Sequence, residues 1–409
     1  SAYNEFTAHA DANIGGKKLA SFTGFTVSSF GDLRQGSRYN SNFPNWGKRN
    51  FYVERINGTD SMIANPDPQK QKFTGYRQYD LIQKILFKTG KTEHVLNFQY
   101  STSSDVPRYD RLTETNSNGT PRSAQWYYGP QKRLMAAWHM ALPATTVFDK
   151  AQLTAAYQAI EESRHNRNYR SSNLNHRIEK VKVATLNVDF VKQLRKEEFN
   201  YGAEFTYNNV NSAANRENIN TGALSALDTR YPDGGSNTRS YAAYASLMHK
   251  FSEKLNLSTG LRFTHNRLFS KFNDASFFPF PFKEVEQKSN AVSGNLGIVY
   301  RPGADWKFSA MLSSGFRTPN VDDMSKVFES NNSTLIVPNP RLNPEKTKNA
   351  ELSIYKKING KILVSGTAWY TKYTDVLTTA FTTFNGADSV LYNGSMSRVT
   401  TVVNKNKAY

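Results

Sequence analysis

The connections between the regular segments of the chain alternate between short and long. Segments with a two-residue apolar/polar rhythm are joined by tight turns near 15–18, 89–92, 142–149, 193–197, 252–254, 302–305 and 359–361. Long polar stretches separate them near 30–75, 102–131, 163–177, 209–238, 270–288, 317–347 and 375–391. Strands that cross an outer membrane up and down give this pattern, with short turns at the periplasmic rim and long loops outside. We therefore predict an all-β, transmembrane, antiparallel up-and-down β-barrel.

The segments themselves carry two different faces. Between 199 and 208, Phe199, Tyr201, Ala203, Phe205 and Tyr207 alternate with Asn200, Gly202, Glu204, Thr206 and Asn208. Side chains alternate across a strand, so one face is suited to hydrocarbon and the other to water. Strands of about ten residues suit a tilted crossing of the hydrocarbon layer. A large soluble β-protein with one wet face is the alternative that this alternation leaves open.

Composition supports the membrane interpretation. The 409 residues contain no apolar run of eighteen, which excludes a helical span. Aromatic residues make up 13% of the chain, as girdles at two membrane interfaces require. Because backbone groups cannot stay unpaired in lipid, a spanning β-protein must close on itself. About fourteen strands are countable, so we expect further strands of the same polypeptide to flank this chain.

The charge balance is strongly basic. Lys and Arg number 52 against 34 Asp and Glu, a formal net charge of +18. The basic residues are dispersed over turns, loops and polar strand faces rather than gathered in one stripe, which argues against nucleic-acid binding. We expect instead a positive lumen that attracts anionic solutes, or contacts with outer-membrane lipid and anionic lipopolysaccharide.

The second half of the chain contains a series of motifs in a fixed order. They are LSTGLRFTH at 257–265, VSGNLGIVYRP at 292–302, SGFRTP at 314–319, NPRLNPEKTKNAE at 339–351 and AWYTKYTD at 368–375. This series resembles the barrel of TonB-dependent outer-membrane receptors. The motif residues to which we assign a structural role are Gly315, Phe316, Arg317, Pro319, Asn339, Pro340, Leu342, Pro344 and Glu345.

The resemblance implies a function as well as a fold. It predicts import of a scarce solute across the outer membrane of a Gram-negative bacterium, with an iron-siderophore, haem or cobalamin as cargo. Oligosaccharide import is the alternative within the family, and a structural or partner-binding barrel is the alternative outside it. Family members draw energy from the TonB complex through a plug domain and have 22 strands. From this resemblance we expect that these 409 residues contain neither the plug nor the last strands, and we assign all of them to the barrel.

Two segments of one long connection combine guanidinium and aromatic groups. The ligand-binding candidates are Arg108, Tyr109, Arg111, Trp126, Tyr127, Tyr128 and, at the end of a later strand, Arg317. Arginines pair with carboxylate or catecholate oxygens, and aromatic rings stack on planar ligands. The alternative is a loop that packs on its own aromatic residues.

Catalytic and metal-binding patterns are not apparent in the sequence. The chain has no cysteine, and its seven histidines lack the close spacing of a preformed metal site. We expect no resident cofactor or metal, although His165 or His176 remains a haem-ligand candidate within this family. Asp322 and Asp323 are adjacent, so in an extended segment they would point to opposite faces and make a poor acid/base pair. The chain is predicted not to be an enzyme, with an outer-membrane barrel enzyme as the rival class.

Overall fold

A computed structural model describes residues 4–36, 38, 41–277, 279–326, 328–331, 334–392 and 395–408. In these residues no helix is long and apolar enough to cross a membrane. Twenty-one of the described strands pair into one sheet, and two more form a separate hairpin. The described pairings are antiparallel, except that β19 (Thr334–Val337) runs parallel to β23.

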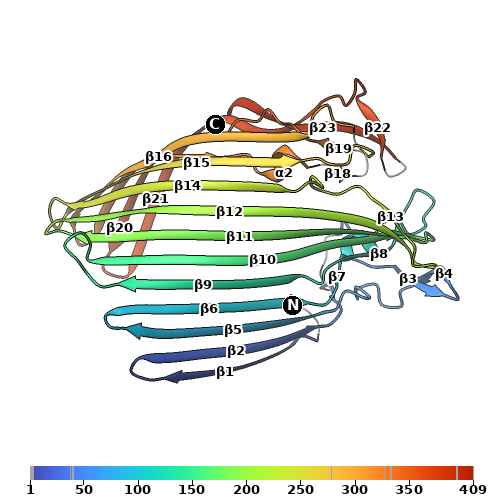
Figure 1. The fold of residues 1–409 in the computed structure, drawn as a ribbon, viewed down its shortest axis with the longest axis horizontal. Coiled ribbons are helices and arrows are strands. Elements are labelled where there is room, and N and C mark those ends of the chain that lie inside the picture. Colours follow the sequence, from blue (N-terminus) through green and yellow to red (C-terminus); the bar gives the residue numbers. More distant parts are fainter. Residues whose placement is uncertain are drawn as a thin grey trace.

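Fifteen of the described strands form the wall and pair with their neighbours in chain order. They are β1 (Phe6–Gly15), β2 (Leu19–Phe30), β5 (Tyr76–Thr89), β6 (Thr92–Ser103), β9 (Lys132–Leu142), β10 (Lys150–Asn168), β11 (Asn173–Gln193), β12 (Glu197–Asn218), β14 (Ser236–Lys250), β15 (Leu255–Lys271), β16 (Glu284–Gly303), β17 (Trp306–Arg317), β20 (Glu345–Ile358), β21 (Ile362–Phe381) and β23 (Ser395–Ala408). Figure 1 shows the short turns together at the left end of the wall and the long connections at the right. The predicted fold class is confirmed, and the strand count is close to the predicted fourteen.

The long connections contain short elements of their own. They are the hairpin β3 (Phe51–Ile56) and β4 (Thr59–Ala64), β7 (Val106–Pro107), α1 (Tyr109–Leu112), β8 (Ser123–Tyr128), β13 (Leu224–Ala226), α2 (Val321–Met324), β18 (Phe328–Asn331), β19 and β22 (Ser389–Tyr392). Small apolar clusters lie among them. One consists of the buried residues Leu268, Val285, Met324 and Leu342.

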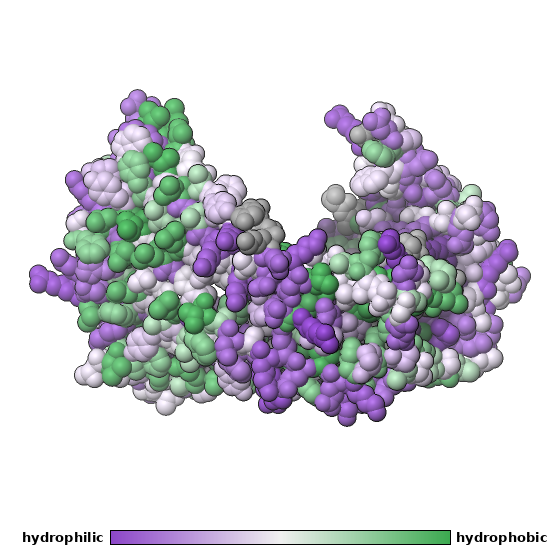
Figure 2. Space-filling view, turned by 90° about the horizontal axis from the view of Figure 1, so that it is seen from above, coloured by the Kyte–Doolittle hydropathy of each residue, from purple (hydrophilic) through white to green (hydrophobic). Residues whose placement is uncertain are grey.

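The wall is curved and hollow. Figure 2 shows two arms on either side of an open hollow, with hydrophobic side chains over much of the arm at the short-turn end. Within the described residues, β1 pairs with β2 and no pairing joins it to β23. Loops attached to distant strands meet across the polar face. The hydroxyl of Tyr392, between β21 and β23, donates to Asp228 Oδ2, between β12 and β14, at 2.7 Å. The polar face is therefore the inner, concave one, and we call the apolar face outer.

The register confirms the predicted alternation. On the outer face, Ala203 lies opposite Val188 and Ala243, and Leu261 and Val292 are 66% and 68% exposed. On the inner face, Glu204 Oε1 accepts a hydrogen bond from Arg262 Nη2 at 3.1 Å. Outer side chains exposed to this degree fit a hydrocarbon solvent rather than water.

Three predicted loop boundaries were wrong. β10 continues to Asn168 and β11 starts at Asn173, so the connection predicted at 163–177 is a tight turn. β12 runs to Asn218 and β21 to Phe381, well into the predicted loops 209–238 and 375–391. These extensions lack the apolar rhythm because water can reach both faces beyond the membrane, yet their ladder hydrogen bonds continue.

Candidate ligand-binding surface at the long-loop end

The connection between β6 and β9 brings its two predicted segments together. β7 pairs with β8, with Val106 opposite Tyr128 and Pro107 opposite Tyr127. β8 also pairs with the end of β10, where Tyr128 lies opposite Arg164. Because Arg164 contacts Glu179 and lies opposite Arg177, which binds Asp228 within the hollow, Tyr128 is on the inner face.

Arg108 is the centre of an aromatic cluster on this inner face. Its Cζ lies 4.9 Å from the Trp126 ring centroid and 5.7 Å from that of Tyr128. Its Nη1 donates to the Tyr128 hydroxyl at 2.9 Å, and the two rings meet edge to face at 5.0 Å. Three of the seven predicted ligand-binding candidates thus come together, and we call Arg108, Trp126 and Tyr128 the Arg108 cluster.

The candidate arginines already have carboxylate partners. Arg108 Nε lies 2.9 Å from Asp110 Oδ1, and Arg111 Nη1 lies 2.7 Å from Glu114 Oε1. A ligand oxygen must therefore compete with an internal carboxylate for either guanidinium. Tyr109, by contrast, is 46% exposed at the start of α1.

Tyr127 lies apart from the Arg108 cluster, because adjacent residues of a strand point to opposite faces. Its ring stacks on His165 at 4.7 Å, and burial raises the pKa of its hydroxyl. His165 Nδ1 is 2.6 Å from His176 Nδ1, and His176 Nε2 is 3.1 Å from Glu217 Oε2. His165 Nε2 contacts Ser163 Oγ at 2.9 Å. Both ring nitrogens of each histidine are thus engaged, which disfavours either as a haem ligand.

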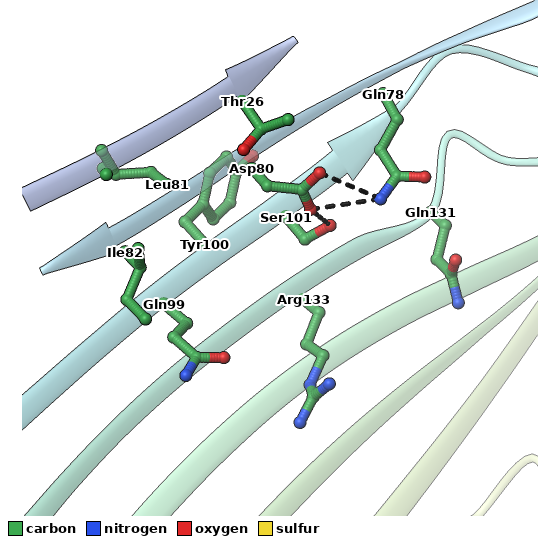
Figure 3. A pocket seen from close by; sticks show the side chains of 11 residues that line it. Thr26, Gln78, Asp80, Leu81, Ile82, Gln99, Tyr100, Ser101, Gln131 and Arg133 are labelled. Carbon is green, nitrogen blue, oxygen red and sulfur yellow. Dashed lines mark hydrogen bonds between the residues drawn. The ribbon is translucent and has the colours of Figure 1, made fainter. Parts of the chain in front are cut away.

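A polar recess of about 420 Å³ lies on the inner face of β2, β5, β6 and β9. Figure 3 shows Asp80 at its centre, bonded to Gln78 and Ser101, with Gln99 and Arg133 on neighbouring strands and Gln131 just before β9. Ser101 Oγ donates to Asp80 Oδ1 at 2.5 Å, and Gln78 Nε2 donates to Asp80 Oδ2 at 3.0 Å. No motif in the sequence predicts this recess, although these residues are the polar half of the strand alternation.

The recess and the Arg108 cluster are parts of one inner surface. Gln131 at the edge of the recess donates through Nε2 to Glu162 Oε1 at 3.3 Å. Arg164 follows two positions after Glu162 on the same face of β10, and its Cζ lies 5.6 Å from the Tyr128 ring centroid. Amide, acidic, basic and aromatic groups therefore line a continuous strip from the hollow to the long-loop end.

Three long connections meet above this strip. Arg177 Nη2 donates to Asp228 at 3.0 Å, and Asp228 also accepts from Tyr392 of β22. The Tyr231 hydroxyl donates to Asp322 Oδ1 of α2 at 2.6 Å. Burial, followed by the bond to Asp322, raises the pKa of Tyr231, so it stays a hydrogen-bond donor. We call these residues the mouth network.

Arg317 and the motif residues pack at the base of α2. Arg317 Nη2 lies 2.7 Å from Asp323 Oδ2, and Nη1 lies 4.0 Å from Glu345 Oε1. Pro319 and Leu342 are buried. A Cβ atom placed on Gly315 would lie 2.9 Å from Thr347 Oγ1. Phe316, Pro340 and Pro344 are half-buried.

Asn339 connects this motif to the last strand. Its Nδ2 donates to the Val402 carbonyl at 2.8 Å, and its Oδ1 accepts from the Arg341 amide at 2.9 Å. Glu345 Oε2 accepts from the Leu377 amide at 3.0 Å. These contacts are internal to the fold, and the structural role of the motif stays a prediction. In the described residues no group of three His, Asp or Glu side chains is arranged to hold a metal ion.

A curved antiparallel wall with an apolar outer face, a polar inner face and loops gathered at one end defines a transmembrane β-barrel protein. Residues 79–408 match the family described as TonB dependent receptor-like, beta-barrel. The chain belongs to this family, which confirms the resemblance found in the sequence. Among curated proteins, no match was found.

Solved structures show the same fold. The Serratia marcescens hemophore receptor HasR, solved with its hemophore and heme, matches with TM-score 0.66 and 16% identity over 99% of this chain and 59% of its own. The copper transporter OprC matches with TM-score 0.69 and 10% identity, over 98% and 56%. The ferric enterobactin receptor PfeA from Pseudomonas aeruginosa matches with TM-score 0.63 and 13% identity, over 99% and 55%.

The chain thus spans little more than half the length of these structures. The family and its structural neighbours are receptors and transporters rather than enzymes, in agreement with the prediction.

Proposed function

We propose that residues 1–409 are the barrel part of a TonB-dependent transporter in the outer membrane of a Gram-negative bacterium. The transporter captures a scarce solute at its long-loop end and draws energy from the TonB complex through a plug. The observation that supports uptake best is the inner strip, which joins the Arg108 cluster at the entrance to the polar recess deeper in the hollow.

The cargo we propose is an iron-siderophore or haem, with cobalamin as a further member of the same class. Trp126 and Tyr128 offer aromatic faces to a planar ligand, and Arg108 and Arg164 lie next to them with donors for anionic oxygens. The named structural neighbours that bind heme or ferric enterobactin support this class.

Oligosaccharide import is the second candidate. The amide side chains of Gln78, Gln99 and Gln131 line the recess, and uncharged amides hydrogen-bond well to sugar hydroxyls. This candidate places ligand recognition in the recess rather than in the Arg108 cluster.

Growth of a deletion strain on single nutrient sources tests the proposal. We expect a plasmid copy of the gene to restore growth on a ferric siderophore or haem as the sole iron source. Trp126→Ala should lower uptake at limiting ligand by about fivefold, because stacking on one ring contributes roughly 1 kcal/mol. Trp46→Ala, at a residue 74% exposed on another long connection, is the matched control.

Restored growth only on a glycan would instead support the second candidate. No rescue on any of the four nutrient classes would refute uptake as the function.

A further inference from the structure

Three basic residues form one cross-strand row on the outer face. Arg239 of β14 lies opposite Arg267 of β15, and Arg267 lies opposite Lys288 of β16. Directly opposed residues of an antiparallel pair have their Cβ atoms about 5 Å apart, and like charges there destabilise the sheet. Placing three cations side by side is thus unfavourable unless an anion lies between them.

The row lies just beyond the apolar surface. Two positions closer to the short-turn end, the outer face carries Tyr241 and His265, and two positions further it carries Phe263 and Val292. Phe263 and Val292 are 50% and 68% exposed. Amphipathic aromatic residues mark the membrane interface in such barrels. The row is therefore at the level of the lipid headgroups on the long-loop side.

The protein neutralises the row incompletely. Arg267 Nε and Lys288 Nζ both approach the same oxygen, Oε1 of Glu286, at 2.6 and 3.3 Å. Arg239 has its Cζ 5.8 Å from the centroid of the Tyr207 ring. The side chains of Arg267 and Lys288 remain 41% and 59% exposed. Three positive charges thus share one described carboxylate and stay accessible from outside.

A second charged row crosses β9, β10 and β11 on the outer face, but here a carboxylate lies between the two cations. Glu161 lies opposite both Lys132 and Lys180, whose Nζ atoms lie 2.9 and 3.4 Å from its carboxylate oxygens. Tyr157, on the same face of β10, is 40% exposed nearer the short-turn end. The arrangement of exposed cations above exposed aromatic residues therefore recurs at two places around the wall.

We infer that the Arg239–Arg267–Lys288 row binds the phosphate groups of lipopolysaccharide. A phosphate between the three cations removes their mutual repulsion, and the acyl chains of the same molecule contact Phe263 and Val292. Clusters of Lys and Arg at a membrane surface recognise anionic headgroups through such charge-assisted bonds. The inference depends on the proposed outer-membrane location, but it does not depend on solute uptake or on the identity of the cargo.

Binding of lipid A to the purified protein in detergent tests the inference. The variant Arg239→Gln, Arg267→Gln, Lys288→Gln removes the row. At low salt its affinity for bisphosphorylated lipid A should fall about 100-fold, from the usual contribution of each basic residue at an anionic surface. The single variant Lys288→Gln, at a position more exposed than Arg267, should lose about fivefold and serves if the triple variant fails to fold.

The matched control removes three basic residues from the opposite rim. Lys250 ends β14, Lys254 is in the turn that follows, and Arg301 is on β16, and all three are exposed. Lys250→Gln, Lys254→Gln, Arg301→Gln therefore changes the net charge equally and should keep lipid A binding unchanged. An equal loss in both triple variants, or no loss in either, would overturn the inference.

Two further ligands identify the source of the phosphate. Dephosphorylated lipid A should bind the unmodified protein as weakly as the row variant binds the bisphosphorylated form. Phosphatidylglycerol vesicles, whose headgroups each carry a single phosphate, should depend on the row less than bisphosphorylated lipid A does, and dependence as strong as that of lipid A would overturn the choice of lipopolysaccharide. Growth on single nutrients separates this inference from the proposed function. If no strain takes up any of the nutrients, the proposed function fails, whereas the lipid A binding results still decide whether the row binds phosphate.

Discussion

Ala203→Arg places a charge on the outer face of β12. Ala203 lies between Val188 and Ala243 in the cross-strand register, so the new guanidinium meets no carboxylate there. Thr206 points to the inner face of the same strand, where it lies opposite Thr185 and Ser240. Arginine at these two positions therefore compares the lipid-facing side of the strand with its water-facing side.

The depth of Ala203 fixes the expected cost. β12 begins at Glu197, and at about 3.3 Å per residue the strand extends roughly 20 Å to Ala203. With a tilt of about 40° this is a height of about 15 Å, near the middle of an apolar band about 25 Å tall. Arginine at the midplane of a membrane barrel costs about 2–4 kcal/mol of folding free energy.

Urea unfolding in lipid vesicles measures this cost. Ala203→Arg should lower the free energy of unfolding by about 2–4 kcal/mol, whereas Thr206→Arg should lower it by less than about 1 kcal/mol. Ala203→Leu, which adds bulk without charge, should be close to neutral and controls for size. If both arginine variants lose the same free energy, the assignment of the outer face to lipid is wrong.

Protease added to intact cells should cut the 30–75 connection at Trp46, which is 74% exposed, while cleavage confined to the turn at 15–18 would reverse the assigned orientation. Asp60→Asn should release the β3–β4 hairpin at a local cost of about 3–5 kcal/mol, because it leaves the buried Arg167 guanidinium without its carboxylate. Burial alone raises the pKa of Asp60, but the hydrogen bonds from Arg167 and the Arg170 amide outweigh it and hold that pKa below its usual value of about 4. The hairpin should therefore stay protected from amide hydrogen exchange above pH 4 and lose protection as pH falls through the lowered pKa, and unchanged exchange down to pH 2 would contradict this.

The fold could be predicted from the sequence for those strand segments whose outer side chains face lipid. Between Phe199 and Asn208 each apolar residue faces hydrocarbon, so the alternation identifies the strand and both of its faces. From Asn209 to Asn218 the strand continues, but water reaches both faces and no apolar rhythm remains. Strand ends outside the membrane are therefore determined by pairing with neighbours, which composition does not reveal.

The candidate site was predictable to the extent that its partners are close in sequence. Arg108 and Trp126 belong to one connection, and Asp110 lies two positions from Arg108. The Arg167–Asp60 pair and the Tyr392–Asp228 bond join residues more than a hundred positions apart. Such contacts depend on how the wall curves, and a single sequence contains no signal for that.

The mouth network has a consequence for the entropy of ligand capture. Because Asp228, Tyr231, Asp322 and Tyr392 connect three long loops, fixing one of them restricts the other two. Free loops would each lose conformational freedom when a ligand binds, which weakens the observed affinity. Here that loss has already occurred during folding. A mouth connected in this way holds its binding groups in place before the ligand arrives, and it opens or closes as one unit rather than loop by loop.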